Sequence, residues 1–143
     1  MSKRLAVLVV LASIAALVVG VSLAGAATSS KVKASLSGSK ELGGGKGKGS
    51  FTGTFKNGKI CYTLKISGVT SPVAAHIHKG AAGKDGNIVI DLLVKFKSGT
   101  SSKCVTAPAK VVSAIKKSPS AYYVNVHTKS KPAGTMRGQL SAA

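Results

Sequence analysis

The sequence predicts an all-β domain: an antiparallel Greek-key sandwich or barrel of about seven or eight short strands with one short helix, after a cleaved signal peptide. Three observations predict this fold class. Apolar and polar residues alternate in many short segments, turn residues separate these segments, and one segment alone has helical spacing. The 143 residues contain no internal repeat, so we expect one domain after the signal.

The first 26 residues have the three-part organisation of a secretory signal peptide. Lys3 and Arg4 precede an apolar run over residues 5–19, and Ala24-Gly25-Ala26 fits the small-x-small cleavage pattern. A retained membrane anchor is the alternative, because the apolar region nearly reaches the roughly 20 residues that a span needs. We expect cleavage, a secreted or envelope-associated protein without a membrane span, and a mature domain over residues 27–143.

The strands are predicted from alternation and from the turns between them. Asn57-Gly58 is a strong hairpin turn. In the strand that follows this turn, Ile60, Tyr62 and Leu64 share one face. Residues 42–49 form a basic, glycine-rich loop without the spacing of a phosphate-binding motif. The predicted strands cover residues 32–36, 51–55, 60–66, 73–78, 88–94, 104–105, 122–127 and 134–141.

The one predicted helix covers residues 108–117. Its apolar residues Val111, Val112 and Ile115 have helical spacing, and Pro119 follows the segment.

Cys61 and Cys104 both lie after the signal. In an exported chain an even pair predicts a disulfide, and free thiols or metal ligands are the alternative. The chain-entropy model gives such a bond about 4 kcal/mol of stabilisation for a loop of this length.

The mature chain is strongly basic. Loss of Lys3 and Arg4 lowers the formal charge from +18 to +16, and Arg137 is then the only basic residue that is not lysine. Lysine is a hydrated point charge that suits weak attraction to polyanions, whereas arginine suits readout of bases. We therefore expect no sequence-specific nucleic-acid binding. The partner is an unknown extracellular ligand, either an anionic envelope polymer or another protein, and a merely solubilising coat is the alternative.

Three segments of the mature chain resemble the CHRD (chordin-type) domain family. They are Ala74-Ala75-His76-Ile77-His78-Lys79-Gly80, Tyr122-Tyr123-Val124-Asn125-Val126-His127-Thr128, and Pro132-Ala133-Gly134 with Arg137-Gly138-Gln139-Leu140. Leu36-Ser37-Gly38 and Glu41 match the start of the domain, so the resemblance covers residues 32–140. After Glu41 the family often has prolines, and this chain has glycine and lysine instead. The resemblance implies an extracellular protein with an immunoglobulin-like barrel or sandwich, and it brings no catalytic residue with it.

All three histidines fall in these segments, and they are the candidate chemistry. His76 and His78 lie two apart on a predicted strand, so their side chains share a face about 6 to 7 Å apart at their bases. Both rings can reach one ion, and His127 can supply a third ligand if the two strands are neighbours. Asp85 or Asp91 can add a carboxylate, and such a set suits copper or zinc. The pair is similar to the H-x-H ligands of copper-zinc superoxide dismutase, a Greek-key sandwich, although no further histidine exists for a second metal.

The competing interpretation of these segments is a structural polar network. Hydrogen bonds among buried polar side chains would hold neighbouring strands together. The expected members are His76, His78, Asn125, Thr128, Arg137 and Gln139.

Enzyme constellations are not evident in this sequence. The only acids are Glu41, Asp85 and Asp91, and nothing places two of them across a cleft or next to a nucleophile. We expect a non-catalytic extracellular or envelope-associated interaction or structural module. The alternative is a mononuclear copper- or zinc-binding protein that uses His76, His78 and His127.

Overall fold

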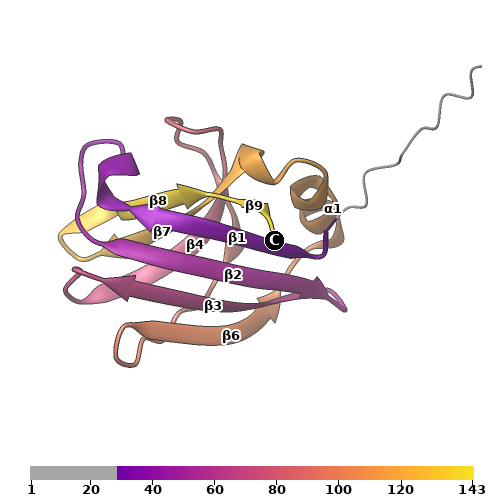
Figure 1. The fold of residues 1–143 in the computed structure, drawn as a ribbon, viewed down its shortest axis with the longest axis horizontal. Coiled ribbons are helices and arrows are strands. Elements are labelled where there is room, and N and C mark those ends of the chain that lie inside the picture. The colour runs from indigo at the N-terminus through magenta and orange to yellow at the C-terminus, as the bar shows by residue number, and fades with distance from the viewer. Residues whose placement is uncertain (1–28) are drawn as a thin grey trace, which may run out of the picture.

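The computed structural model describes residues 29–143, and the expected signal peptide lies outside them. The described residues form one antiparallel sheet of nine strands that curls into a nearly closed barrel (Figure 1). The strands are β1 (Lys31–Ser37), β2 (Lys48–Lys56), β3 (Lys59–Ser67), β4 (Pro72–Lys79), β5 (Ile88–Asp91), β6 (Thr100–Thr106), β7 (Tyr122–Thr128), β8 (Lys131–Gln139) and β9 (Ser141–Ala142). The predicted fold class is confirmed.

The order of the strands round the barrel brings distant segments together. It runs β5-β4-β7-β8-β1-β2-β3-β6, and the short β9 pairs with β1. The chain therefore crosses between the two halves of the sheet after β3, after β5 and again after β6. As a result β4, β7 and β8, which carry the three segments that resemble the CHRD family, lie side by side.

The barrel interior holds the apolar core. On β3 the side chains of Ile60, Tyr62 and Leu64 are buried, as the alternation predicts. The Tyr62 hydroxyl donates a hydrogen bond to the Leu92 carbonyl at 2.9 Å, so its polar end is satisfied inside the barrel. Burial of each large apolar side chain contributes about 1.5–3 kcal/mol, and this core is the main source of stability.

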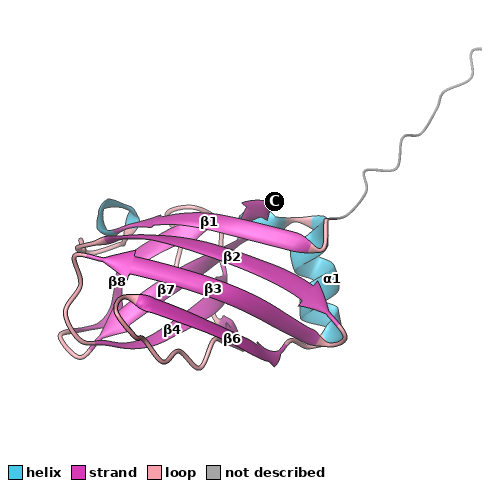
Figure 2. Ribbon diagram, turned by 60° about the horizontal axis from the view of Figure 1, so that its bottom comes forward, coloured by secondary structure: helices cyan, strands magenta, loops and turns pink. Residues whose placement is uncertain are grey.

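The helix α1 (Ala109–Lys117) lies at one end of the barrel (Figure 2). Ile115 is fully buried, and Val111 and Val112 pack against the core. The predicted helix is therefore confirmed. Two single turns of 3-10 helix, η1 (Gly38–Lys40) and η2 (Pro119–Ala121), were not predicted. Between residues 29 and 143 no helix is long and apolar enough to cross a membrane.

The predicted hairpin and disulfide are both confirmed. Asn57 and Gly58 have φ angles of 51° and 69°, the left-handed values that a type I′ turn requires. Cys61 and Cys104 face each other on β3 and β6 and are joined by a disulfide. This bond lies on the outer, solvent-facing side of the sheet.

Several predicted strand boundaries are wrong. The last long strand, expected over residues 134–141, runs from Lys131 to Gln139, and β2 begins at Lys48, inside the expected loop over residues 42–49. The strand expected over residues 88–94 ends at Asp91, because Leu93 takes a left-handed φ of 48° that no strand accommodates. The short segment expected at residues 104–105 extends instead from Thr100 to Thr106, since β6 pairs along most of β3.

Candidate metal centre

The strand β7 is buried along its whole length, on both of its faces. Val124 and Val126 belong to the core cluster inside the barrel. The alternate residues Tyr123, Asn125 and His127 point the other way, and they line a cavity on the outer side of the sheet. A strand whose outward residues are polar and also buried marks this side of the barrel as the place to look for a site.

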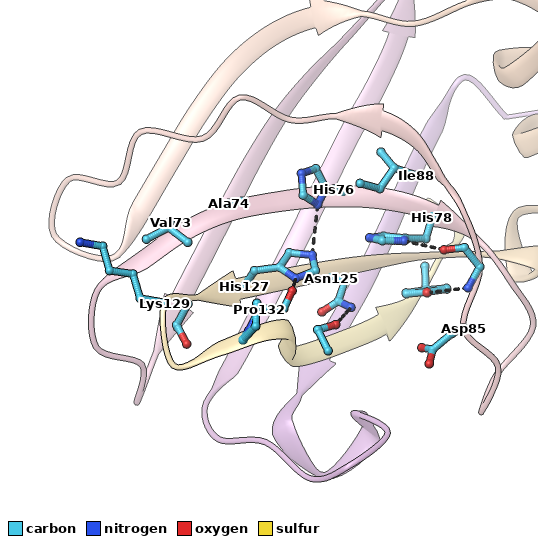
Figure 3. A pocket seen from close by; sticks show the side chains of 14 residues that line it. Val73, Ala74, His76, His78, Asp85, Ile88, Asn125, His127, Lys129 and Pro132 are labelled. Carbon is cyan, nitrogen blue, oxygen red and sulfur yellow. Dashed lines mark hydrogen bonds between the residues drawn. The ribbon is translucent and has the colours of Figure 1, made fainter.

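The three histidines converge over β4 and β7 (Figure 3). The two strands are antiparallel neighbours, and Ala74 and Asn125 occupy the register positions opposite His127 and His76. The Nδ1 atom of His76 lies 3.1 Å from Nε2 of His127. One ligand nitrogen from each of the three rings lies within 4.8 Å of the others. The structure therefore places the three predicted residues in one cluster.

Backbone carbonyls fix the orientation of two of these rings. Nδ1 of His78 lies 2.8 Å from the carbonyl oxygen of Gly86, and Nδ1 of His127 lies 2.9 Å from that of Pro132. A carbonyl oxygen only accepts, so each Nδ1 carries the hydrogen and each neutral ring has its lone pair on Nε2. The Nε2 atom of His78 is buried and has no hydrogen-bond partner among the described residues. Such an atom requires an explanation.

The third ring, His76, lies between a histidine and a carboxylate. Its Nδ1 faces His127, and its Nε2 lies 3.9 Å from Oδ1 of Asp91. With the hydrogen on Nδ1, the ring donates to His127. With the hydrogen on Nε2, it faces the acid and leaves a lone pair on Nδ1 directed at the other two rings.

The surroundings favour the neutral form of His76 and His78. Burial lowers the pKa of His76, the neighbouring His127 lowers it further, and Asp91 opposes the change. Burial also lowers the pKa of His78, against the opposing effect of the hydrogen bond to Gly86. Neutral imidazole is the form that binds metal, so the lowered pKa values of these two rings favour metal binding at neutral pH.

An ion cluster centred on the buried Arg137 lies next to the histidines. The Nη2 atom of Arg137 donates hydrogen bonds to the carboxylates of Glu41 and Asp85, each at 2.6 Å. The guanidinium also lies over the ring of Tyr123, 4.4 Å from its centre, and the ring of His78 stacks on the same tyrosine at 4.9 Å. Burial would lower the pKa of Arg137, but the two carboxylates raise it above its ordinary value. The arginine therefore stays charged and ties two loops to β8.

The remaining residues of the predicted polar network lie on the same outer face. Asn125 donates to the Ala133 carbonyl at 3.3 Å, and Thr128 bonds to Ser130 at 3.1 Å. Gln139 donates to three backbone carbonyls, those of Gly80, Ser120 and Tyr122. The other three residues proposed for the network are also hydrogen-bonded. His76 bonds to His127, and His78 bonds to the carbonyl of Gly86. Arg137 bonds to the carboxylates of Glu41 and Asp85.

No residue other than glycine fits at position 134. Its φ is 135°, and a Cβ atom there would lie 2.5 Å from Oδ1 of Asn125 and 2.7 Å from Oε2 of Glu41. Only glycine permits both the backbone conformation and the close packing.

Sequence reasoning missed the roles of Tyr123 and Glu41. A signal for Glu41 existed, because a chain with three acids and one mature arginine must pair that arginine with an acid if it is buried. The ring of Tyr123 gave no such signal, since a tyrosine on a strand is ordinary. Of the two candidate carboxylate ligands, Asp91 lies beside His76 and Asp85 is paired with Arg137.

These features define a class: a small antiparallel β-barrel domain with a histidine-lined cavity on its outer surface. Within that class the sequence profile of the CHRD domain matches residues 32–140, which is most of the chain. The chain belongs to the CHRD domain family, as the three segments predicted. None of the curated proteins and none of the solved structures matches it.

Proposed function

We propose that this protein is an exported, non-catalytic domain that binds one copper or zinc ion through His76, His78 and His127. The observation that carries the proposal is the buried, unpartnered Nε2 of His78, which belongs to a cluster of three imidazole nitrogens within 4.8 Å. The guanidinium Nε of Arg137 is also buried without a partner, but it is a donor only and cannot ligate, whereas Nε2 of His78 carries a lone pair and lies beside two other ligand nitrogens.

The separations of the nitrogens support a tetrahedral ion. Two nitrogens at about 2.0–2.1 Å from a tetrahedral ion are about 3.3 Å apart, and His76 and His127 already stand at 3.1 Å. His78 requires a shift of about 1–1.5 Å to reach the same ion. Its free nitrogen makes this shift inexpensive, because no hydrogen bond of Nε2 is lost.

The outer partners of the rings support the same assignment. Metal-bound histidines usually donate their second nitrogen to a carbonyl or carboxylate, which fixes the tautomer and the direction of the ring. Here Gly86 and Pro132 supply carbonyls to His78 and His127, while the carboxylate of Asp91 lies near His76 at 3.9 Å, too far for a direct hydrogen bond. Three neutral imidazoles suit Cu(II) or Zn(II) and leave one coordination position open.

The test is stoichiometric metal binding by the mature, oxidised, untagged protein. We expect about one Cu(II) or Zn(II) per chain after dialysis, measured by elemental analysis. The chain has three histidines, all in the cluster, so a His76→Gln/His78→Gln variant should lose the metal. A Lys33→Gln/Lys65→Gln variant on exposed positions of the opposite half is the matched control and should keep it.

Full metal content in the histidine variant, or none in the parent protein, would overturn this function. Circular dichroism on each variant separates loss of ligands from loss of fold. If the double variant does not fold, His127→Gln alone answers the same question from the neighbouring strand.

A second function, attachment to an anionic envelope polymer, is favoured by the distribution of charge. Glu41 is buried, and both it and Asp85 are paired with Arg137, so the surface lysines meet little opposing charge. Export rests on the expected signal peptide and on the disulfide, which suits an oxidising compartment. We expect retention on acidic polymer at low salt and release at about 0.5–1 M salt, since screening removes such attraction. Retention that is insensitive to salt would contradict it.

A further inference from the structure

The cavity beside the three histidines is larger than one metal ion needs. Its volume is about 550 Å³, and it is lined by residues of β4, β7 and the segments around them. This size falls within the range of clefts that hold small organic molecules. Next to the open coordination position of a bound ion there is therefore room for a small organic ligand.

The wall of this cavity beyond the histidines is largely apolar. Val73, Ala74, Ile88, Pro132 and Ala133 line it. Four large apolar side chains are exposed among residues 29–143, and two of them, Val73 at 49% and Ile88 at 53%, stand on this wall. Exposed apolar side chains that gather at one cavity indicate a site for an apolar group.

The charges at the cavity favour a negative ligand head. Three neutral imidazoles leave the charge of a divalent ion uncompensated, and Lys129 adds a cation to the lining. Asp85 also lines the cavity, but its carboxylate is paired with Arg137 at 2.6 Å. Asp91 stands behind His76 and is not among the residues of the cavity wall. No free protein carboxylate among the described residues is thus placed to fill the open position from the cavity side.

We propose that the cavity binds a small amphipathic monoanion, whose carboxylate takes the open position on the metal and whose short hydrocarbon body packs against Val73 and Ile88. The inference rests on the proposed metal site and adds the class of ligand. A sugar or an inorganic phosphate would leave the apolar wall unused, whereas a hydrocarbon body removes it from water.

The experiment uses the Cu(II)-loaded mature protein, with metal content established first. Acetate, hexanoate and pentyltrimethylammonium are titrated, followed by the visible absorption of Cu(II) and by calorimetry. We expect hexanoate to change the spectrum and to bind at least about tenfold more tightly than acetate, because its additional methylene groups are buried. The cation, which has a similar body and cannot ligate, should not bind.

Two variants locate the hydrocarbon body. Val73→Thr/Ile88→Thr keeps β-branched side chains at exposed strand positions and should reduce the preference for hexanoate over acetate to less than about threefold. Leu42→Thr, at another exposed apolar residue that does not line the cavity, should leave the preference unchanged.

The possible outcomes distinguish failure of the proposed ligand class from failure of the proposed metal site. Absence of metal in the parent protein overturns both. A metal-loaded protein that binds acetate and hexanoate equally, or that binds the cation as well as hexanoate, overturns the ligand class alone. Loss of the hexanoate preference in Leu42→Thr as well would show that the cavity wall is not the cause.

Discussion

The strands β3 and β7 have similar alternating sequences and different surroundings. On β3 one face is buried and the other is largely exposed, so polar and apolar residues separate by face. On β7 every residue is buried, including Asn125, His127 and Thr128. The difference shows that alternation identifies the core face of a strand and leaves open what covers the other face. Where that second face is buried and polar, hydrogen bonds and charges must be satisfied, and this is where the candidate site lies.

The two halves of the sheet are also cross-linked by different chemistry. In the half that contains β3, a disulfide joins exposed Cys61 to Cys104. In the half that contains β7, the buried Arg137 joins Glu41 and Asp85. A covalent bond acts mainly on the unfolded chain, whereas an ion cluster acts only in the folded state.

The largest expected effect comes from breaking the ion cluster. In Arg137→Met, the carboxylate of Glu41, whose side chain is 2% exposed, loses its partner. We expect a loss of about 3–5 kcal/mol in the free energy of unfolding, measured by urea denaturation. Lys33→Met, on the exposed face of β1, is the control and should change stability by less than about 0.5 kcal/mol. Equal effects of the two substitutions would remove the contrast between the halves.

Removal of the disulfide should have the next largest effect. The Cys61→Ser/Cys104→Ser variant lacks the disulfide between residues that are 43 apart in sequence. We expect its free energy of unfolding to fall by about 2–4 kcal/mol in urea denaturation. Because the bond is remote from the histidines, metal content should not change. A disulfide-free variant that folds normally but no longer binds metal would show that the halves are coupled.

Within the histidine half, Asp91 tests the exposed edge of the site. Asp91→Asn keeps an acceptor for the Leu93 amide and removes the negative charge near Nε2 of His76. We expect metal affinity to fall by about three- to tenfold, less than for a buried outer partner, because the aspartate is exposed. Competition with a coloured chelator measures this change. An unchanged affinity would mean that His76 is oriented without the carboxylate.

The smallest expected effect is the response of the metal-free protein to acid. The pKa values of His76 and His78 are lowered in the folded state, so the unfolded chain takes up protons first as the pH falls. Stability should therefore be highest above about pH 7 and decrease from the ordinary value of about 6.5 down to the lowered values. We expect this loss of stability to be smaller than the effects of the substitutions above, because solvent screens half-buried groups.

Urea midpoints at a series of pH values measure this response. A variant with all three histidines replaced by glutamine should show a flat profile over the same window. If the parent and the variant decline together, groups outside the histidine half carry the pH dependence.

Much of the fold could be predicted from local sequence. The buried residues Ile60, Tyr62 and Leu64, the Asn57-Gly58 turn and the disulfide follow from alternation, turn chemistry and an even cysteine count. The end of β5 did not follow, because residues 88–94 alternate well and the break at Leu93 is a left-handed backbone conformation. Tertiary pairing overrides such local signals.

The candidate site was predictable in its residues and not in its geometry. Two histidines on one strand face already indicated convergence, and the third required β4 and β7 to be neighbours, which only the strand order reveals. The hydrogen bonds from Nδ1 to Gly86 and Pro132 depend on where the intervening loops fold back. The pairing of Glu41 with Arg137, 96 residues apart, has no local trace in the sequence.

The pairing of β1 with strands from the other end of the chain has a consequence for folding. Val32 lies opposite Ala142, and Ser37 lies opposite Arg137. The strand β1 therefore stays without two of its partners until β8 and β9 have been synthesised. Sheets closed by such distant contacts fold slowly, since the entropy of closing a long loop is lost before the contacts stabilise the sheet. The barrel thus closes only after β8 and β9 have been made, and a chain that lacks them exposes the edge of β1 in the meantime.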